Sequence, residues 1–233
     1  ARETAARVAA GAIAKLLLNE LNIDVRSGIC EIDGVKADNF NFENARNSEI
    51  FALDSNVEDA QKNAILKAKN SHNSVGGVAL INVKNCPVGL GEPIYHKLDA
   101  QIANAMMSIN AVKAVEIGDG ILASRVLGFD NNDQIRKSGF KTNHSGGILG
   151  GISNGDDINV KVYFKATPSI FIEQDTVDIY GNEVECKLKG RHDPCVAIRG
   201  SVVAESMTAL VLADMLLLNM SSKVENIKKV YAK

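Results

Sequence analysis

Alternating apolar and polar positions mark the strands of this chain. Every second residue from Ile158 to Phe164 is apolar, which predicts a strand with one buried face. The segments 176–180 and 183–188 flank Gly181-Asn182, a two-residue turn signal, and together predict a β-hairpin. Further strand candidates are the short apolar runs 78–83 and 112–117.

Two segments are apolar nearly all round, as expected of buried helices. In residues 4–21, alanine and glycine fill most positions between larger apolar side chains, so this helix is predicted to pack on more than one face. Between Val202 and Leu218 only four polar residues interrupt the apolar sequence. Such a helix belongs in an interior.

Two other helices are predicted to have a single apolar face. Ser55-Asn56-Val57-Glu58 matches a capping box and predicts a surface helix that runs to Lys69. Pro93 suits the first turn of a helix that reaches Ile109 and carries one apolar stripe. The stretch 22–56 shows no pattern from which elements can be assigned.

Turn-rich antiparallel strands combined with apolar helices favour an α+β fold over repeated βαβ units. We expect the helices to be held between antiparallel sheets, because a helix that is apolar all round must be covered on all sides. No linker or low-complexity run divides the sequence, so we predict a single domain over residues 1–233.

Composition and charge then exclude several classes of partner. Lys+Arg 26 against Asp+Glu 28 gives a net charge of −2, so the chain has no basic excess for nucleic acid or an anionic membrane. The most apolar stretch, 207–220, contains Asp214 and is shorter than the ~20 residues of a membrane span. Residues 1–4 lack a secretory signal pattern. We therefore expect a soluble, cytoplasmic protein.

The four cysteines predict neither a metal site nor disulfides. Cys30, Cys86, Cys186 and Cys195 form no CxxC pair and have no histidine at zinc-finger spacing. In a chain long enough to build its own core, scattered thiols are expected to be buried small hydrophobic residues.

Two segments could bind a phosphate or a flat ring. Glycines crowd the segment 143–155, and backbone without Cβ can approach a ligand closely or direct N–H groups at an anion. For this segment taken alone, we favour the alternative that the glycines only form a tight loop. Lys165-Ala166-Thr167-Pro168-Ser169 offers one ammonium and two hydroxyls beside a rigid proline, although a solvated strand end is the simpler interpretation.

The densest group of ionisable residues is Gly190-Arg191-His192-Asp193-Pro194-Cys195. Pro194 disfavours helix at Asp193, so this segment is predicted to be extended. Arg191 could bind an anion while Asp193 handles a proton, or the two could form a local ion pair, and spacing does not separate these alternatives. Arg2 opens the first helix, where the helix dipole does not favour a cation, so it is either an anion contact or a solvated end residue.

Several motifs, taken together and in this order, resemble the chorismate synthase family. They are Ala1-Arg2-Glu3-Thr4-Ala5-Ala6-Arg7-Val8-Ala9-Ala10-Gly11-Ala12, Gly89-Leu90-Gly91-Glu92-Pro93, Asn143-His144-Ser145-Gly146-Gly147-Ile148-Leu149-Gly150-Gly151-Ile152-Ser153 and the Gly190–Cys195 segment. The resemblance runs from Ala1 to about Leu218 and is weakest between Asn22 and Val75.

The resemblance implies a fold, a reaction and a cofactor. The fold is a β-α-β sandwich with central helices, assembled as a homotetramer. The reaction is the anti-1,4-elimination of phosphate from 5-enolpyruvylshikimate 3-phosphate, which gives chorismate, with reduced FMN as cofactor and no net redox change.

The resemblance also implies roles for individual residues. Asp193 matches a carboxylate near flavin N5 that takes part in proton transfer, and Arg2 matches an arginine that faces the anionic substrate. The positions that match flavin contacts are Asn110, Ala111, Gly150, Lys165, Ala166, Thr167, Pro168, Ser169 and Arg191.

One departure from the family concerns the start of the chain. Family members carry a further upstream stretch with two catalytic histidines and an Arg-Ser-Ser before the position of Ala1. We therefore expect this chain to correspond to the C-terminal part of the enzyme and to be inactive alone. The alternative is a non-catalytic flavin- or phosphate-binding module that keeps the core and the oligomer surfaces.

Overall fold

Three of the predicted strands join two strands from the stretch 22–56 in one large antiparallel sheet. The computed structural model describes residues 2–232, so Ala1 of the N-terminal motif lies outside the described residues. Five strands follow the order β2-β1-β3-β9-β4, and every neighbouring pair is antiparallel. These strands are β1 (Asp24–Ile32), β2 (Val35–Lys36), β3 (Gly77–Lys84), β4 (Val112–Ile117) and β9 (Ile158–Phe164).

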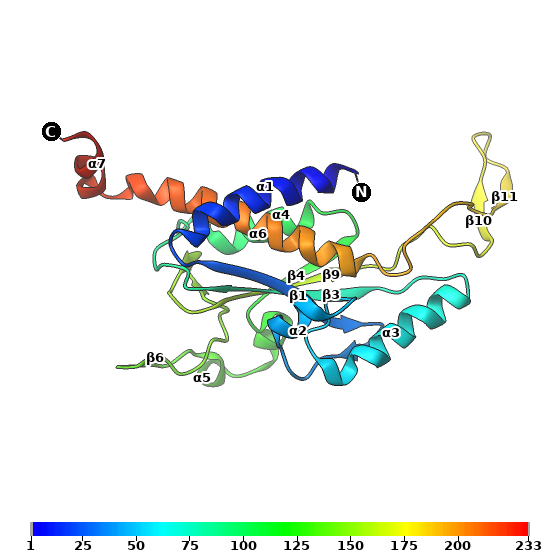
Figure 1. Ribbon diagram of the computed structural model, residues 1–233, viewed down its shortest axis with the longest axis horizontal. Coiled ribbons are helices and arrows are strands. Elements are labelled where there is room, and N and C mark those ends of the chain that lie inside the picture. The colour runs from blue at the N-terminus through cyan, green and yellow to red at the C-terminus, as the bar shows by residue number, and fades with distance from the viewer. Residues whose placement is uncertain (1, 233) are drawn as a thin grey trace.

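Three smaller antiparallel pairs lie outside this sheet. They are β5 (Ile135–Arg136) with β6 (Gly139–Phe140), β7 (Ile148–Leu149) with β8 (Ile152–Ser153), and β10 (Gln174–Val177) with β11 (Glu183–Cys186). The β10–β11 hairpin extends away from the body of the molecule, and all its strand residues are exposed (Figure 1).

Helices cover both faces of the large sheet. In Figure 1, α1, α4 and α6 lie on one side of it and α2 and α3 on the other. The α-helices are α1 (Arg2–Asn19), α2 (Phe42–Asn47), α3 (Ser55–Asn70), α4 (Leu98–Met107), α5 (Gly128–Asn131), α6 (Ala197–Asn219) and α7 (Val224–Tyr231), and the 3₁₀ turns are η1 (Gly120–Arg125) and η2 (Met220–Ser222).

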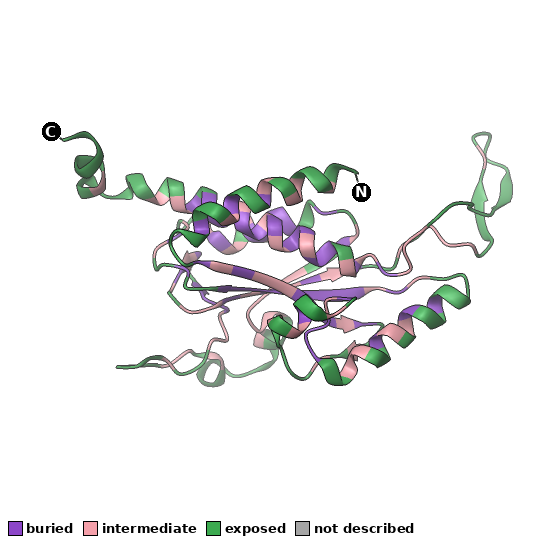
Figure 2. Ribbon diagram, in the orientation of Figure 1, coloured by how far each residue is buried: buried purple, intermediate pink, exposed green. Residues whose placement is uncertain are grey.

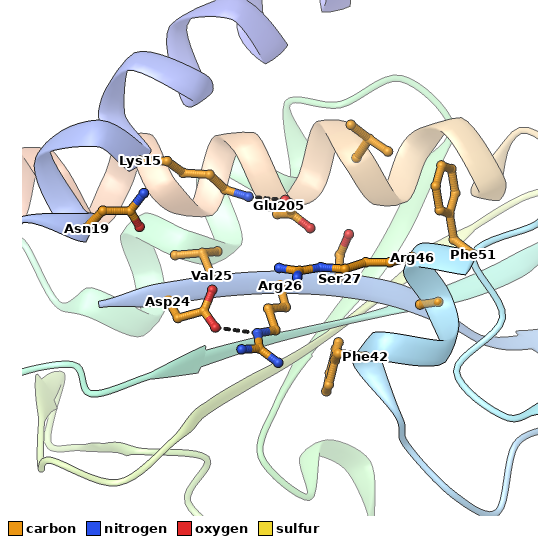
Figure 3. A pocket seen from close by; sticks show the side chains of 12 residues that line it. Lys15, Asn19, Asp24, Val25, Arg26, Ser27, Phe42, Arg46, Phe51 and Glu205 are labelled. Carbon is orange, nitrogen blue, oxygen red and sulfur yellow. Dashed lines mark hydrogen bonds and ion pairs between the residues drawn. The ribbon is translucent and has the colours of Figure 1, made fainter. Parts of the chain in front are cut away.

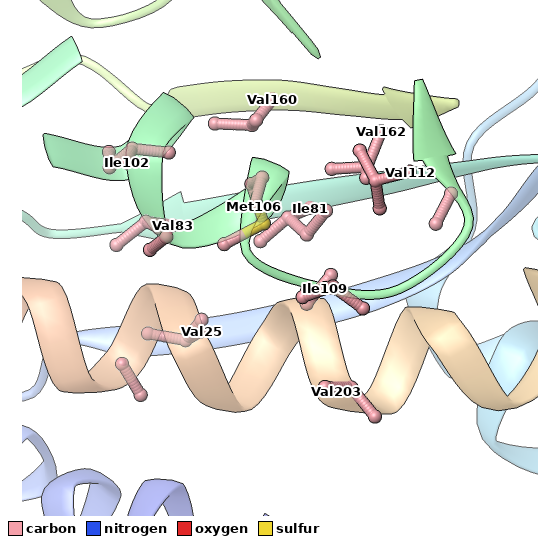
Figure 4. Packing of buried hydrophobic residues seen from close by; sticks show 14 of the residues in the cluster. Val25, Ile81, Val83, Ile102, Met106, Ile109, Val112, Val160, Val162 and Val203 are labelled. Carbon is pink, nitrogen blue, oxygen red and sulfur yellow. The ribbon is translucent and has the colours of Figure 1, made fainter. Parts of the chain in front are cut away.

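The core lies between the sheet and α6. Figure 4 shows Val83 of β3, Val162 of β9 and Met106 of α4 on the side of the sheet that faces Val203 of α6, and all four side chains are buried. β9 alternates buried and half-buried residues along its whole length, as its period-two pattern predicts. β3 is buried on both faces because a second apolar cluster, with Ala45 of α2, covers its other side.

The α+β class with antiparallel sheets is confirmed. Strands β3, β4 and β9 lie where the period-two and apolar patterns predict them. α6 is the central helix, lying between the sheet and α1, so in residues 2–232 the layer beyond α6 is a helix. The stretch 22–56 that the sequence left unassigned forms β1, β2 and α2.

Burial separates the two apolar helices. Figure 2 shows α6 buried along most of its length, whereas α1 has an exposed outer face. Only Gly11, Ala14 and Leu18 of α1 are buried, while Ile13 and Leu16 are 70% and 67% exposed. The expectation that this first helix packs on more than one face is therefore wrong for residues 2–232.

Two helix starts also differ from the prediction. α3 is capped by Asp54, which accepts a hydrogen bond from the backbone N–H of Asn56 at 3.0 Å, so Ser55 is not the cap of a capping box. Backbone N–H donors, that of Asn56 first, hold the pKa of Asp54 below its usual range. α4 begins at Leu98 rather than near Pro93, because residues 92–96 form a turn in which Glu92 N donates to the His96 carbonyl.

The β10–β11 hairpin forms with a longer loop than Gly181-Asn182 predicts. Val177 pairs with Glu183, so five residues connect the strands. The Asp178 carboxylate accepts hydrogen bonds from the side chain and backbone of Asn182 and from Tyr180 N, and these lower its pKa. The asparagine therefore stabilises the turn through Asp178 rather than as half of a two-residue loop.

Among residues 2–232, one helix, Ala197–Ser222, is long and apolar enough to span a membrane by length and composition. Half of its most apolar part is buried inside the fold, and the core helices of soluble proteins have similar length and composition. The packing of α6 against α1, β1 and β3 accounts for its apolar sequence.

Candidate functional site

The segment that leads into α6 is fixed from two sides. Val75 N donates to the Pro194 carbonyl at 2.8 Å, which ties the segment to the loop between α3 and β3. The Asp193 carboxylate pairs with Nη1 of Arg199 at 2.9 Å, so it does not form the local ion pair with Arg191 that the spacing left open. Arg191 is exposed and remains available for a ligand.

The Lys165–Ser169 segment leaves β9 and is held by the same loop. Ser74 Oγ donates to the Thr167 carbonyl at 2.7 Å, and Lys165 N donates to the Ala111 carbonyl at 2.9 Å. Thr167 Oγ1 is buried without a hydrogen-bond partner in residues 2–232. Buried hydroxyls are normally paired, so a ligand atom could occupy this position.

These segments enclose a cavity of about 370 Å³, which we call the His192 pocket. Three of its lining side chains are rings in contact: the centroid of Phe171 lies 6.1 Å from that of His72, edge on, and 5.5 Å from that of His192. Its charged and polar lining residues include Lys69, His72, Ser169, Arg191, His192 and Asp193. The lining of the pocket therefore combines aromatic rings with cationic side chains.

Asn110 and Ala111 lie next to this region but do not line the His192 pocket. They connect α4 to β4, and the hydrogen bond to Ala111 places them beside Lys165. Ala111 has a φ of 73°, a left-handed conformation that disfavours residues with a Cβ. The structure thus gathers Asn110, Ala111, Lys165–Ser169, Arg191 and Asp193 around one end of β9.

Gly150 lies elsewhere. It forms the tight turn between β7 and β8 with Gly151, at φ values of 60° and 89°, which favours glycine at both positions. No atom lies within 4 Å of an ideal Cβ at Gly150, so this turn faces open space.

Gly150 and Asp193 are at opposite ends of α6. The β7–β8 turn bonds to the start of α4 (Leu98 N to the Gly151 carbonyl, 2.7 Å), and β8 bonds to Gly89, whose carbonyl accepts from Asn219 at the end of α6. Asp193 precedes the start of α6, and 23 helical residues span about 34 Å. A single copy of the chain does not bring Gly150, a predicted flavin contact, and Asp193, the predicted proton-transfer carboxylate, into one cavity.

Arg2 is exposed in the first turn of α1 and does not line the His192 pocket. Arg7, further along α1, pairs with Glu3 and donates to Ser108 Oγ at 2.6 Å. The N-terminal ends of α1 and α6 lie toward the same end of the molecule (Figure 1).

The loops around the glycine-rich segment form a polar network. Asp133 accepts hydrogen bonds from His144 N, Ser145 N and Thr142 Oγ1 at 2.7 to 2.9 Å. Burial alone would raise the pKa of Asp133, but these donors outweigh it and lower the pKa. His144 Nδ1 bonds to Asp119 Oδ2 at 2.6 Å. The tight-loop interpretation therefore accounts for most of this segment.

A second cavity, of about 420 Å³, lies where β1 faces α1, α6 and α2 (Figure 3). Its charged side chains are paired within the chain: Lys15 with Glu205, and Arg26 with both Asp24 and Glu43. None of the site residues predicted from the sequence lines it.

The cysteines are all free, and no group of His, Cys, Asp and Glu in residues 2–232 could hold a metal ion. Three are buried, and burial raises the pKa of Cys30 to about 12 and that of Cys86 to about 11. Cys186 is the exception to the expected burial, because it lies on the exposed hairpin.

The sequence did not assign the loop between α3 and β3 to the site. His72, Asn73 and Ser74 of this loop, with Lys69 at the end of α3, form one wall of the His192 pocket. His72 has a φ of 59°, and its backbone carbonyl accepts from Phe171 N at 3.1 Å. The polar run before Gly76-Gly77 was the available signal, but only the fold brings it next to residues more than 90 positions later.

The fold and pocket define an α+β protein with antiparallel sheets and a cationic, aromatic-lined cavity suited to an anionic ligand. A family model described as chorismate synthase matches residues 1–217. A crystal structure of chorismate synthase superposes with a TM-score of 0.79 at 33% identity, covering 98% of this chain and 67% of that one. The chain belongs to the chorismate synthase family.

Curated relatives named chorismate synthase are highly similar. The protein of Aliarcobacter butzleri (strain RM4018) is 83% identical and that of Sulfurimonas denitrificans (strain ATCC 33889 / DSM 1251) is 64% identical, each over all 233 residues of this chain. The Helicobacter pylori (strain ATCC 700392 / 26695) protein is 59% identical over 99% of the chain. The chain spans about 65% of the length of these relatives.

Proposed function

We propose that this chain provides part of the active site of a carbon–oxygen lyase. The reaction is the anti-1,4-elimination of phosphate from 5-enolpyruvylshikimate 3-phosphate to give chorismate, with reduced FMN as cofactor, in the cytoplasm. The observation that carries the proposal is the His192 pocket, in which the two predicted ligand-binding segments of this family member meet: Ser169 from one, Arg191 and Asp193 from the other.

The residues around this pocket fit a flavin. Two buried polar atoms there, Thr167 Oγ1 and His192 Nε2, have no partner in residues 2–232 and can accept or donate hydrogen bonds to a ligand. Phe171 offers an aromatic face, and Lys165 and Arg191 offer cations for a phosphate. When bound, reduced flavin supplies electron density as the carbon–oxygen bond of the substrate breaks.

Asp193 is positioned to move a proton. Its side chain lines the pocket, and the ion pair with Arg199 fixes the direction of the carboxylate. With flavin bound, a carboxylate held in this way would be able to take part in proton transfer at N5. Arg2 would contribute charge toward the anionic substrate from the start of α1.

The separation of Gly150 from this group supports a site shared between copies. A flavin held at the His192 end of one copy meets a Gly150 turn only if a second copy presents it, because α6 separates the two within one chain. The open space around Gly150 allows such an approach. A homotetramer, in which every site lies near a neighbouring copy, satisfies this requirement.

An anaerobic turnover assay tests the function. We expect chorismate from 5-enolpyruvylshikimate 3-phosphate and reduced FMN when the chain is extended upstream with the corresponding part of the Aliarcobacter butzleri relative. In that extended protein, Asp193→Asn should keep flavin affinity and slow elimination at least tenfold. Asp59→Asn, on the exposed face of α3, is the matched control.

Three outcomes would contradict the proposal. Flavin binding without turnover in the extended protein would favour the non-catalytic binding module. Equal loss of flavin affinity and rate in Asp193→Asn would make Asp193 structural. Loss of the homotetramer without loss of activity would remove the shared site.

A further inference from the structure

The His192 pocket contains two imidazoles, His72 and His192, to which neither the motifs nor the relatives assign a role. They come from segments 120 positions apart in the sequence and meet on either side of Phe171. Lys69 and Arg191 line the same pocket. The one carboxylate in the lining, that of Asp193, is already paired with Arg199, so the pocket has an excess of positive charge.

The His192 ring has an unused hydrogen-bonding atom. Nε2 is buried and has no partner in residues 2–232, although buried polar atoms are normally paired. An ideal Cβ at Gly190 would lie 3.5 Å from this nitrogen. Because Gly190 has no side chain, it offers this nitrogen no side-chain partner.

The surroundings of the pocket favour an anion. Pro194 of the lining stands three residues before Ala197, where α6 begins, and the N-terminal end of a long helix carries partial positive charge. The apolar floor, which includes Phe171, lowers the local dielectric and strengthens charge-assisted hydrogen bonds. A phosphate has several strong acceptor oxygens, so it can use more than one of these donors at once.

We propose that the His192 pocket is a subsite for a phosphate monoester, and that His192 and His72 bind its oxygens together with Lys69 and Arg191. The phosphate could belong to the flavin mononucleotide or to the substrate, and only this choice rests on the proposed function. The two imidazoles are binding residues, and no chemical step is assigned to them.

Inorganic phosphate is the first probe, because it tests the subsite without flavin or turnover. Titration of this chain, followed by phosphorus NMR, should show His192→Phe weakening phosphate binding about tenfold or more. Phenylalanine keeps the ring against Phe171 and removes only the nitrogens. His192→Gln, which returns one N–H donor, should recover part of the lost affinity.

His72→Asn gives an independent test in case His192→Phe does not fold. Asparagine tolerates the left-handed backbone at this position, and His72 is exposed, so the fold should be unaffected. We expect a loss of phosphate affinity of about fivefold or more. His96→Asn, at an exposed histidine outside this pocket, is the matched control and should bind phosphate as the unaltered chain does.

Comparison of FMN with riboflavin identifies the source of the phosphate. If the flavin phosphate occupies the pocket, both variants weaken FMN binding and leave riboflavin binding unchanged. If the substrate phosphate occupies it, both variants weaken binding of 5-enolpyruvylshikimate 3-phosphate and leave both flavins unchanged.

Phosphate affinity that is unchanged in both folded variants, or lowered equally in His96→Asn, would overturn the proposal. This result is distinguishable from failure of the proposed function. A chain that binds phosphate through His192 and His72 but gives an extended protein without turnover would keep the subsite and lose the lyase. An active extended protein with unaltered phosphate binding in both variants would keep the lyase and lose the subsite.

Discussion

The helices α1 and α6 have similar apolar sequences but very different surroundings. α6 lies between α1 and the sheet, and residues on all its sides are buried, among them Leu212 and Ala204. α1 packs on α6 by one side only, so Ile13 and Leu16 remain exposed. An apolar sequence therefore predicts a helix well, whereas the burial of that helix depends on what packs against each of its faces.

The two helices approach closely at one point. An ideal Cβ at Gly11 of α1 would lie 2.4 Å from Cβ of Ser206 and 2.6 Å from its Cα. Because part of that contact is backbone, α6 cannot yield by a change of side-chain rotamer. Glycine at this position therefore sets the distance between the helices.

Filling this contact should destabilise the fold strongly. Gly11→Leu should destabilise the fold by about 3 kcal/mol or more, because overpacking forces the two helices apart. Ala12→Leu, one residue later on the exposed side of α1, should cost less than about 0.5 kcal/mol. Urea unfolding followed by circular dichroism measures both, and similar losses would show that the close approach does not matter.

The next effect compares leucines on the two helices. Leu212→Ala should lower the free energy of unfolding by about 3 kcal/mol, because Leu212 is fully buried and its removal leaves a cavity. Leu16→Ala, at a residue that is 67% exposed on α1, should change it by less than about 1 kcal/mol. An equally large loss for Leu16→Ala would mean that the outer face of α1 is covered in solution.

The smallest effect concerns the ion pair that joins the helices. Lys15 and Glu205 are both partly buried, with side chains 28% and 21% exposed. A double-mutant cycle with Lys15→Met and Glu205→Gln should give a coupling free energy of about 1 kcal/mol or less, because the cost of desolvating the two charges offsets much of their Coulomb attraction. The coupling should fall as salt is added, and a salt-independent value would rule out an ionic contribution.

Local patterns predicted elements better than they predicted element ends. β9 follows its alternation over all seven residues because one face meets α6 and the other is half-buried. The starts of α3 and α4 were misplaced because tertiary contacts decide them: Asp54 also accepts from the backbone of Asp38 and Asn39, and Leu98 N donates to Gly151. Such partners are distant in sequence and leave no local signal.

The site was predictable only in part for the same reason. The segments with Lys165 and Asp193 were found as motifs, and the structure brings them together at one end of β9. His72 had no pattern to distinguish it from a surface histidine, since its position in the pocket depends on the bond between its carbonyl and Phe171. The separation of Gly150 from Asp193 follows from the length of α6 and from where its two ends attach.

The strand order β2-β1-β3-β9-β4 has a consequence for synthesis on the ribosome. β3 can pair with β1 soon after residue 84 leaves the ribosome. The other edge of β3 stays unpaired until β9 is synthesised, more than 70 residues later. During that interval the nascent sheet presents an unpaired apolar edge, which can associate with other chains. Translation speed between residues 84 and 164, and chaperones that shield this edge, should therefore govern how much of the newly made protein reaches its folded form.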